Sequence, residues 1–265
     1  MRRTIFTLSL FAVFASFLPA AIAADWGNLS GQIIVDGKVA KPKAANVNKD
    51  QAYCGKHGLV DESVVVSPKG ELRNAIVWLY LKSTEKPPAI HESYAKAEKA
   101  EVLLDNMKCR FTPHAFGYRT GQTLVVSNSD PVGHSSKIEF FHEGNPPINP
   151  NLPGGTKLKV KIGNRETLPA QVQCGIHPWM SAWILVQDHP YFAVTDAKGR
   201  FSIKNLPAGK WRFRFWHEKP GYLQKVTVNG TAKTWIAGRA SITIKPGEND
   251  LGVIKVKAAI FSDKF

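Results

Sequence analysis

The feature that most constrains the fold of this chain is a set of short segments in which apolar and polar residues alternate. In residues 211–216 the aromatic side chains fall on one face and the arginines on the other, and in residues 157–162 three lysines alternate with aliphatic residues. Alternation with a period of two is typical of strands with one buried and one solvated face. Further apolar, β-branched or aromatic segments lie between turn residues at 31–36, 75–82, 122–127, 183–187, 200–204 and 241–245. The pattern predicts an all-β protein built from β-sandwiches.

The composition agrees with this fold class and excludes several others. The chain has 265 residues, of which 43% are hydrophobic, enough for one large core or two modest ones. It contains 21 glycines and 17 prolines, and only 21% of its residues are charged, which excludes a coiled coil and an acidic disordered chain. The one segment with helical character spans residues 91–101, where Ala, Glu and Lys follow a Pro87-Pro88 breaker.

The first residues have the pattern of an export signal. Arg2 and Arg3 precede an uncharged, largely apolar run that ends in Ala21-Ile22-Ala23, a small-x-small cleavage pattern. We therefore expect residues 1–23 to be a secretory signal peptide and the mature protein to be periplasmic or extracellular. The alternative is an uncleaved anchor helix, which would associate the protein with a membrane.

The net charge of +14, which removal of residues 1–23 lowers to +12, indicates the kind of partner. In an exported protein such an excess favours an acidic protein or another anionic surface. The basic residues are spread through strand-like segments rather than collected in a tail. We therefore expect no nucleic-acid partner.

One compact segment, Cys174-Gly175-Ile176-His177-Pro178-Trp179-Met180, carries the residue types of a metal site. Another histidine, His134, lies forty residues before Cys174. A thiolate, two imidazoles and a thioether are the ligand set of a blue-copper electron-transfer site, in which Cys and two His form a plane and Met lies at longer range. A tight loop between two strands can place three ligands around one ion, and a neighbouring strand end can supply the fourth. Zinc could occupy the same ligands, but the methionine favours copper.

The segments around these ligands resemble those of cupredoxins. Residues 111–113, 121–124 and 128–130, followed by His134, are similar to the approach of that fold to its first histidine ligand, and the Cys-x2-His-x2-Met loop resembles the short ligand loop of amicyanin. The resemblance covers residues 101–189. It implies a Greek-key β-sandwich in which one type 1 copper ion is held by four residues: His134, Cys174, His177 and Met180. Many cupredoxins have Asn directly after the first histidine, and Ser135 stands there in this chain, which predicts a weaker tie between the ligand loops.

The resemblance implies an exported type 1 (blue) copper protein that shuttles single electrons between redox partners, such as an acidic cytochrome or a dehydrogenase. Four protein ligands leave no open position for a substrate, so we expect no enzymatic activity. The ligand loop has no second Cys and the chain no His-Cys-His run, which argues against binuclear and trinuclear copper centres. In the family the loop histidine is the exposed edge of the site. Here the apolar patch around it would consist of Pro131, Val132, Ile176, Pro178 and Trp179.

A second function remains open at this point: a non-redox copper carrier or sensor, or an adhesion module whose metal only holds a loop. The size of the flanking sequence favours this alternative, because a bare electron carrier needs no such addition. The thiolate and thioether favour the redox function, since they form a redox ligand set.

Residues 24–100 and 190–265 resemble the two parts of one transthyretin-like, or carboxypeptidase-regulatory-like, sandwich. Residues 31–37 and 74–79 are similar to the opening strands of that module, and residues 194–203 and 206–209 to its continuation. We therefore expect the copper domain, residues 101–189, to be inserted into a flanking sandwich. Three consecutive domains are the competing layout.

Three cysteines in an exported protein leave at least one thiol for another purpose. With Cys174 assigned to copper, Cys54 and Cys109 are most simply a disulfide, which in the insertion layout would join the flanking sandwich to the start of the copper domain. Cys54 and His57 repeat the Cys-x2-His spacing of the ligand loop, but no methionine follows at a matching distance. A second metal site there, or among the remaining histidines, is the weaker alternative.

Overall fold

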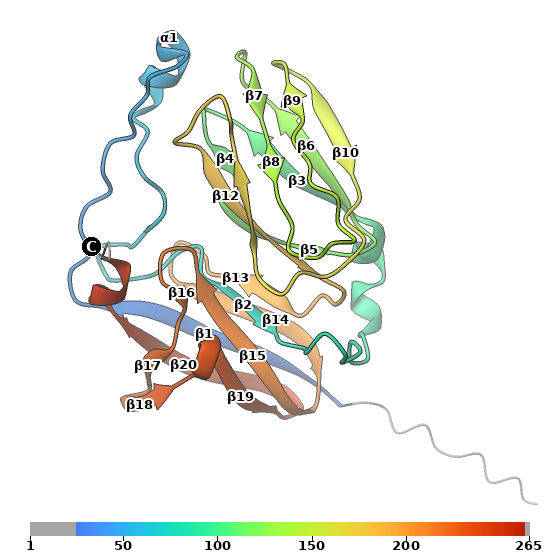
Figure 1. Ribbon diagram of the computed structural model, residues 1–265. Helices are drawn as coiled ribbons and strands as arrows, with labels where there is room; N and C mark the ends of the chain where they lie inside the picture. The colour runs from blue at the N-terminus through green and yellow to red at the C-terminus, as the bar shows by residue number, and fades with distance from the viewer. Residues whose placement is uncertain (1–24, 263–265) are drawn as a thin grey trace, which may run out of the picture.

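The computed structural model describes residues 25–262, which form two β-sandwiches (Figure 1). The predicted signal peptide, residues 1–23, lies outside the described residues. Strands dominate the structure, and each of the segments that the sequence predicts as a strand overlaps an observed one, so the all-β class is confirmed. None of the helices between residues 25 and 262 has the length and the apolar character that crossing a membrane requires.

The flanking sandwich takes its strands from both ends of the described chain. One sheet has the order β14-β1-β20-β17-β18, with bounds Arg200–Pro207, Trp26–Asp36, Gly247–Lys257, Lys225–Val228 and Thr231–Thr234. The facing sheet has the order β13-β2-β15-β16, with β19 also paired to β15, and its bounds are Phe192–Val194, Ile76–Leu79, Gly209–His217, Gly221–Tyr222 and Arg239–Ile244. Buried aliphatic and aromatic side chains from both sheets, including Leu29, Ile33, Phe213, Phe215 and Ile254, form its core.

The central sandwich is made from residues 101–187. One sheet has the order β10-β6-β3-β4, with bounds Lys157–Val160, Thr123–Asn128, Glu101–Asn106 and Phe111–Thr112. The facing sheet has the order β5-β12-β11-β8, with bounds Ala115–Arg119, Ser181–Gln187, Ala170–Gln173 and Lys137–Ile138. A short ribbon of β7 (His134–Ser135) and β9 (Asn151–Leu152) lies at one end.

The two sandwiches pack on each other through a small aromatic and aliphatic cluster. Its buried members come from both sandwiches: Ile76, Trp78, Ala115, Leu185 and Trp216. The rings of Trp183 and Trp216 meet at 4.9 Å between centroids. Glu218 of the flanking sandwich accepts a hydrogen bond from Trp183 Nε1 (2.9 Å) and pairs with His114 of the central sandwich. The contact between the sandwiches therefore combines apolar burial with hydrogen bonds, and His114 Nδ1 is a buried polar atom without a hydrogen-bond partner among the described residues.

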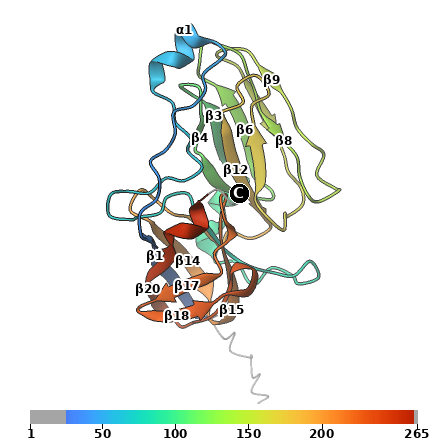
Figure 2. The ribbon, with the colours of Figure 1, turned by 60° about the vertical axis from the view of Figure 1, so that its left-hand side comes forward.

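One long loop of the flanking sandwich packs against the central sandwich. Residues 43–61, which we call the α1 loop, leave after β1 and contain the helix α1 (Gln51–Cys54) and the 3-10 turn η1 (Gly55–His57). Two hydrogen bonds pair its legs, Ala45 N–H to Leu59 O (2.9 Å) and Asp61 N–H to Lys43 O (2.8 Å). Figure 2 shows α1 at the far end of the central sandwich. Its Cys54 and Leu59 belong to the core of the central sandwich, although its sequence lies between two strands of the flanking one.

The helix expected at residues 91–101 is not an α-helix. The segment forms two 3-10 turns, η2 (Glu92–Tyr94) and η3 (Lys96–Lys99), and β3 begins at Glu101. The turns contain no buried residue. A short helix in water depends on packing of an apolar face. Within the two turns only Tyr94 packs against a core, and the remaining residues are exposed, so the segment has helix propensity without a buried face.

The expected alternation of buried and solvent-exposed side chains along each strand is correct for some strands and wrong for others. In β15, Arg214 is only 6% exposed, because this face packs against the central sandwich, where Arg214 donates to Thr167 O (3.1 Å). Its guanidinium also lies 4.2 Å over the ring of Tyr80 of the flanking sandwich. In β10, Leu158 is exposed, because β10 is an edge strand.

Two short 3-10 turns, η4 (Ile236–Gly238) and η5 (Ala258–Phe261), complete the fold.

We predict that Gly117→Ala weakens the contact between the sandwiches. A Cβ atom at Gly117 of β5 would lie 2.1 Å from the Phe192 ring of β13, and overpacking of this kind costs about 1–3 kcal/mol of unfolding free energy. Denaturant titration measures the loss. Gly163→Ala is the matched control, because a Cβ there meets nothing within 4 Å. Equal stability of the two variants would show that the Gly117 contact is not a tight one.

Candidate metal centre

The predicted ligands lie on two connections at one end of the central sandwich. His134 begins β7, after the turn that follows β6, and residues 174–180 form the connection between β11 and β12. Two backbone hydrogen bonds close this second connection, Met180 N–H to His177 O (2.9 Å) and Cys174 N–H to Met180 O (3.3 Å). The turn brings Cys174 and His177 to the same side, facing β7.

The structure brings His134, Cys174 and His177 together. Cys174 Sγ lies 3.9 Å from His134 Nδ1 and 3.7 Å from His177 Nδ1, and the two Nδ1 atoms are 2.9 Å apart. Both histidines are fully buried, and Cys174 is 3% exposed. The three donor atoms therefore face one small volume that is closed to solvent.

The other ring nitrogens of both histidines contact carboxylates, which lets us assign the protons. His134 Nε2 lies 2.9 Å from Asp130 Oδ2, and His177 Nε2 lies 2.8 Å from Asp50 Oδ2. Because an ionised carboxylate only accepts hydrogen bonds, we assign the Nε2 protons as donors to these oxygens. Each Nδ1 then faces the shared volume, with a lone pair when its histidine is neutral and with a proton that it can donate to the Cys174 sulfur when its histidine is charged. Two lone pairs at 2.9 Å repel each other unless a proton or a cation lies between them.

Asp130 is held as a carboxylate by its own donors. Its oxygens accept the backbone N–H groups of Lys108 and Cys109 and the hydroxyl of Tyr53. Burial raises the pKa of Asp130, but these hydrogen bonds and the one from His134 outweigh it, so that its pKa lies below the ordinary value. The orientation of His134 is therefore fixed by a carboxylate that is itself fixed by the backbone.

Cys174 is held as a thiolate. Burial raises the pKa of its thiol, but hydrogen bonds with His134 and His177 and from two backbone amides lower the pKa to about 5. The amides are those of Ser135 and His177, each 3.4 Å from the sulfur. For His177, burial lowers the pKa, whereas contacts with Cys174 and Asp50 raise it above its ordinary value. A thiolate beside two imidazoles is the charge arrangement that binds a cation.

These residues fit a copper ion. Protein metal bonds to histidine nitrogen and cysteine sulfur are about 2.0–2.3 Å long, and the largest of the three separations, 3.9 Å, is shorter than two such bonds. Thiolate and imidazole are ligands that copper prefers. A second grouping among the described residues, Cys109 with Asp130 and His134, lacks a free thiol, because Cys109 is in a disulfide. Met180 ends the ligand loop and is 2% exposed. Its role as fourth ligand rests on the sequence.

Ser135 ties the two ligand connections together. Its hydroxyl accepts the N–H of Gly175 (2.7 Å), and its own N–H points at Cys174 Sγ (3.4 Å). A hydrogen bond between a neutral hydroxyl and an amide contributes about 1 kcal/mol. The position that many cupredoxins fill with Asn therefore still links both connections in this chain.

The expectation of an exposed ligand histidine is wrong for this protein. His177 is fully buried, because Asp50 of the α1 loop covers its Nε2 edge. Of the expected apolar patch, Pro131, Ile176 and Pro178 are exposed, whereas Val132 and Trp179 are half-buried. The Trp179 ring lies 4.9 Å from the His177 ring, and its Nε1 donates to Cys109 O (3.1 Å).

Sequence reasoning missed three residues of this centre: Asp50, Tyr53 and Asp130. The structure joins Cys54 to Cys109 in a disulfide, with 5.5 Å between the Cα atoms. The expected Cys54–Cys109 pairing was the one signal in the sequence that pointed to these residues, because it brings residues 50–54 next to residues 108–110. It did not reveal which side chains would reach the ligands.

The other histidines that the sequence raised as possible ligands do not join the ligand cluster. His57, which repeats the loop spacing after Cys54, packs edge-on against the Tyr53 ring at 4.8 Å. His114 pairs with Glu218, and His189 and His217 are buried. Within residues 25–262, none of these four belongs to a group of metal-ligating side chains.

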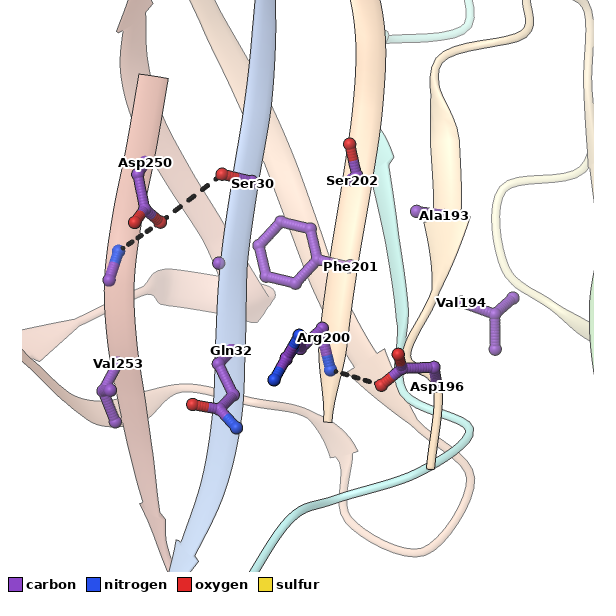
Figure 3. Close-up of a pocket in the computed structure, with 12 residues that line it drawn as sticks. Ser30, Gln32, Ala193, Val194, Asp196, Arg200, Phe201, Ser202, Asp250 and Val253 are labelled. Atoms are coloured by element: carbon purple, nitrogen blue, oxygen red, sulfur yellow. Dashed lines mark hydrogen bonds between the residues drawn. The ribbon is translucent and has the colours of Figure 1, made fainter. Parts of the chain in front are cut away.

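The flanking sandwich carries a shallow groove between β1, β13, β14 and β20 (Figure 3). Its acidic groups already have local partners. Asp250 accepts the Ser30 hydroxyl (3.4 Å) and the Gly252 N–H (2.8 Å), and Asp196 accepts the Arg200 N–H (2.9 Å). The groove shares no residue with the metal centre.

No protein-family model matches the sequence, and no curated protein matches it either. Among solved structures, the chain is similar to a copper-containing nitrite reductase from Thermus scotoductus SA-01, with 18% identity and a TM-score of 0.29. The match covers 41% of this chain and 25% of the reductase, so the chain spans about a quarter of that protein's length.

Two smaller proteins are also similar over about a third of the chain. One is a Cu(I) form of an amicyanin mutant, with 14% identity, a TM-score of 0.29 and coverage of 32% of this chain and 81% of amicyanin. The other is a purple cupredoxin from Nitrosopumilus maritimus, with 19% identity, a TM-score of 0.27 and coverage of 33% and 99%. The case for a metal centre rests on the geometry of His134, Cys174 and His177.

We predict that Cys174 of the metal-free protein titrates far below an ordinary thiol. Its pKa is about 5, against an ordinary value of 9.0. Thiolate absorbance in the ultraviolet should therefore be present at neutral pH and disappear as the pH falls through about 5. Because the folded-state pKa is lowered, the stability that the thiolate contributes is present above the ordinary thiol pKa and is lost as pH falls through the folded-state pKa. Cys174→Ser is the control, since the other cysteines form a disulfide, and a midpoint near 9 would contradict the assignment.

Proposed function

We propose that this protein is a type 1 (blue) copper protein that carries single electrons between redox partners. The convergence of one thiolate and two imidazole Nδ1 atoms on a volume closed to solvent supports this most strongly. Met180, at the end of the same loop, is the proposed axial ligand. Bound copper would supply a one-electron couple, and a single thiolate with two histidines and a methionine is the ligand set of that kind of site.

The chain's own residues keep this ligand set in place. The imidazoles are fixed by Asp130 and Asp50, and the sulfur receives two backbone N–H groups. Since each donor has a second partner, the ligands need not move when the charge of the ion changes. Such a rigid set is suited to electron transfer, because outer contacts hold the ligand orientation.

We propose that the protein is not an enzyme. Four protein ligands would fill the coordination shell, and the three that are brought together are buried at 3% exposure or less. A substrate would have neither an open metal position nor a path to it.

We propose that partners bind at the apolar surface formed by Pro131, Ile176 and Pro178, which we call the proline patch. These residues are exposed and flank the ligands in sequence. The half-buried Trp179 follows Pro178 of this surface in sequence and contacts the His177 ring. Small apolar surfaces suit brief redox encounters, and the net charge, +14 for the chain and +12 without residues 1–23, favours an acidic cytochrome or dehydrogenase.

We propose that the protein is exported to the periplasm or the cell exterior. The basic residues and apolar run of the first 23 residues support this. The disulfide between Cys54 and Cys109 also supports it, because structural disulfides persist mainly in oxidising compartments.

The copper-loaded protein should have an intense visible absorption band from charge transfer between thiolate and copper. Cys174→Ser should lose the band, because a hydroxyl cannot replace the thiolate. His142→Ala, which removes an exposed histidine outside the centre, should keep it. A colourless wild-type protein that still binds copper would overturn the electron-carrier function and support the copper carrier or sensor.

Electron exchange with an acidic cytochrome should slow as salt is added. Salt shortens the distance over which opposite charges attract each other: the screening length is about 30 Å at 0.01 M ionic strength and about 8 Å at 0.15 M. Stopped-flow measurement of the second-order rate constant tests this, with a basic cytochrome as the matched partner. A rate constant for the acidic cytochrome that does not change with salt would contradict the proposed steering.

A further inference from the structure

The α1 loop reaches the ring nitrogens of both histidine ligands. Asp50 Oδ2 lies 2.8 Å from His177 Nε2. Tyr53 donates its hydroxyl to Asp130 Oδ1 (2.8 Å), and Asp130 Oδ2 lies 2.9 Å from His134 Nε2. One histidine is therefore held directly by this loop and the other through one intermediate carboxylate, although the loop belongs to the flanking sandwich by sequence.

Asp50 is fixed in position by its backbone. It adopts a left-handed conformation (φ 46°, ψ 39°), which Asp tolerates better than most residues. Its carbonyl accepts the N–H groups of Tyr53 (2.9 Å) and Cys54 (2.8 Å), at the start of α1. The carboxylate is thus aimed at His177 by a bend that the chain holds with its own hydrogen bonds.

A disulfide also joins the α1 loop to residues beside the metal centre. The disulfide joins Cys54 to Cys109, whose N–H donates to Asp130 (2.8 Å) and whose carbonyl accepts Trp179 Nε1 (3.1 Å). One connected hydrogen-bond network therefore surrounds the ligands. It includes residues of the α1 loop, of the turn after β3 and of the ligand loop.

We propose that Asp50 and Tyr53 are positioning residues of the copper centre, so that the flanking sandwich supplies the outer half of the site. This inference rests on the proposed function. Outer hydrogen bonds fix the orientation and the basicity of histidine ligands. The carboxylate of Asp50 adds a negative charge beside one ligand, which favours the more positive, oxidised state of the ion. It also closes the imidazole edge of His177, which is fully buried.

The inference predicts separate effects for charge and for contact. Asp50→Asn keeps an oxygen acceptor for His177 but loses the charge, so the reduction potential of the copper protein rises. Asp50→Ala loses both, so the affinity for Cu(II) also falls by about ten- to hundred-fold. Tyr53→Phe keeps the ring and loses the hydrogen bond to Asp130, and it lowers the affinity in the same direction.

The experiment compares these variants with Asp61→Asn. Asp61 lies in the same loop and is exposed, and its carboxylate accepts the N–H of Ser63 (2.8 Å), so this control removes one charge without touching a ligand. Voltammetry gives the potential and chelator competition gives the affinity. NMR of the metal-free and the Cu(I) protein gives the exchange rate of the His177 Nε2 proton with water, which rises in Asp50→Ala and stays at the wild-type value in Asp61→Asn.

The outcomes separate this inference from the proposed function. A wild-type protein without the copper–thiolate band overturns the proposed function and this inference with it. A wild-type protein with the band, in which Asp50→Asn has the potential of Asp61→Asn and Asp50→Ala keeps the slow proton exchange, overturns the inference alone. A raised potential together with faster exchange supports it.

Discussion

The metal centre depends on the burial of three electron-pair donors against one another. Two imidazole nitrogens 2.9 Å apart and a thiolate within 3.9 Å of both have no favourable contact among themselves unless positive charge lies between them. Burial strengthens this demand, because the surroundings cannot screen the donors as water does. The cluster is stable only because each donor has a fixed partner on its other side, and this requirement determines which parts of the chain must meet here.

Three segments meet that requirement. The connection before β12 supplies Cys174 and His177, β7 supplies His134 and Ser135, and the α1 loop supplies Asp50 and Tyr53. The first two belong to the central sandwich and are linked through Ser135. The third comes from the flanking sandwich and is joined through the disulfide at Cys109. The second sandwich is therefore built into the surroundings of the candidate ligands, which gives a physical reason for its presence beside a small metal centre.

Predictions from local pattern succeeded where burial followed the strand period. The all-β class and the strand segments followed from alternating residues and turn residues, and the grouping of His134, Cys174 and His177 followed from ligand type and spacing. They failed where another part of the chain covered a surface. Arg214 is buried because the central sandwich packs over it. The 3-10 turns within residues 91–101 contain no buried residue, so they lack the buried apolar face that would stabilise an α-helix. The ligand His177, expected at the surface, lies beneath Asp50.

The sequence by itself determined the chemistry of the donors: one thiol left unpaired by an odd cysteine count, one histidine in the same short loop and another forty residues earlier in the chain. Side-chain type and short-range spacing are local properties, so they can be read along the chain. Only the tertiary structure decided the protonation and exposure of those donors. The lowered pKa of Cys174, the direction of each imidazole and the closed edge of His177 come from Asp50, Tyr53 and Asp130. Asp50 is 127 residues away from His177 in sequence, and a contact over that distance exists only after the two sandwiches have packed.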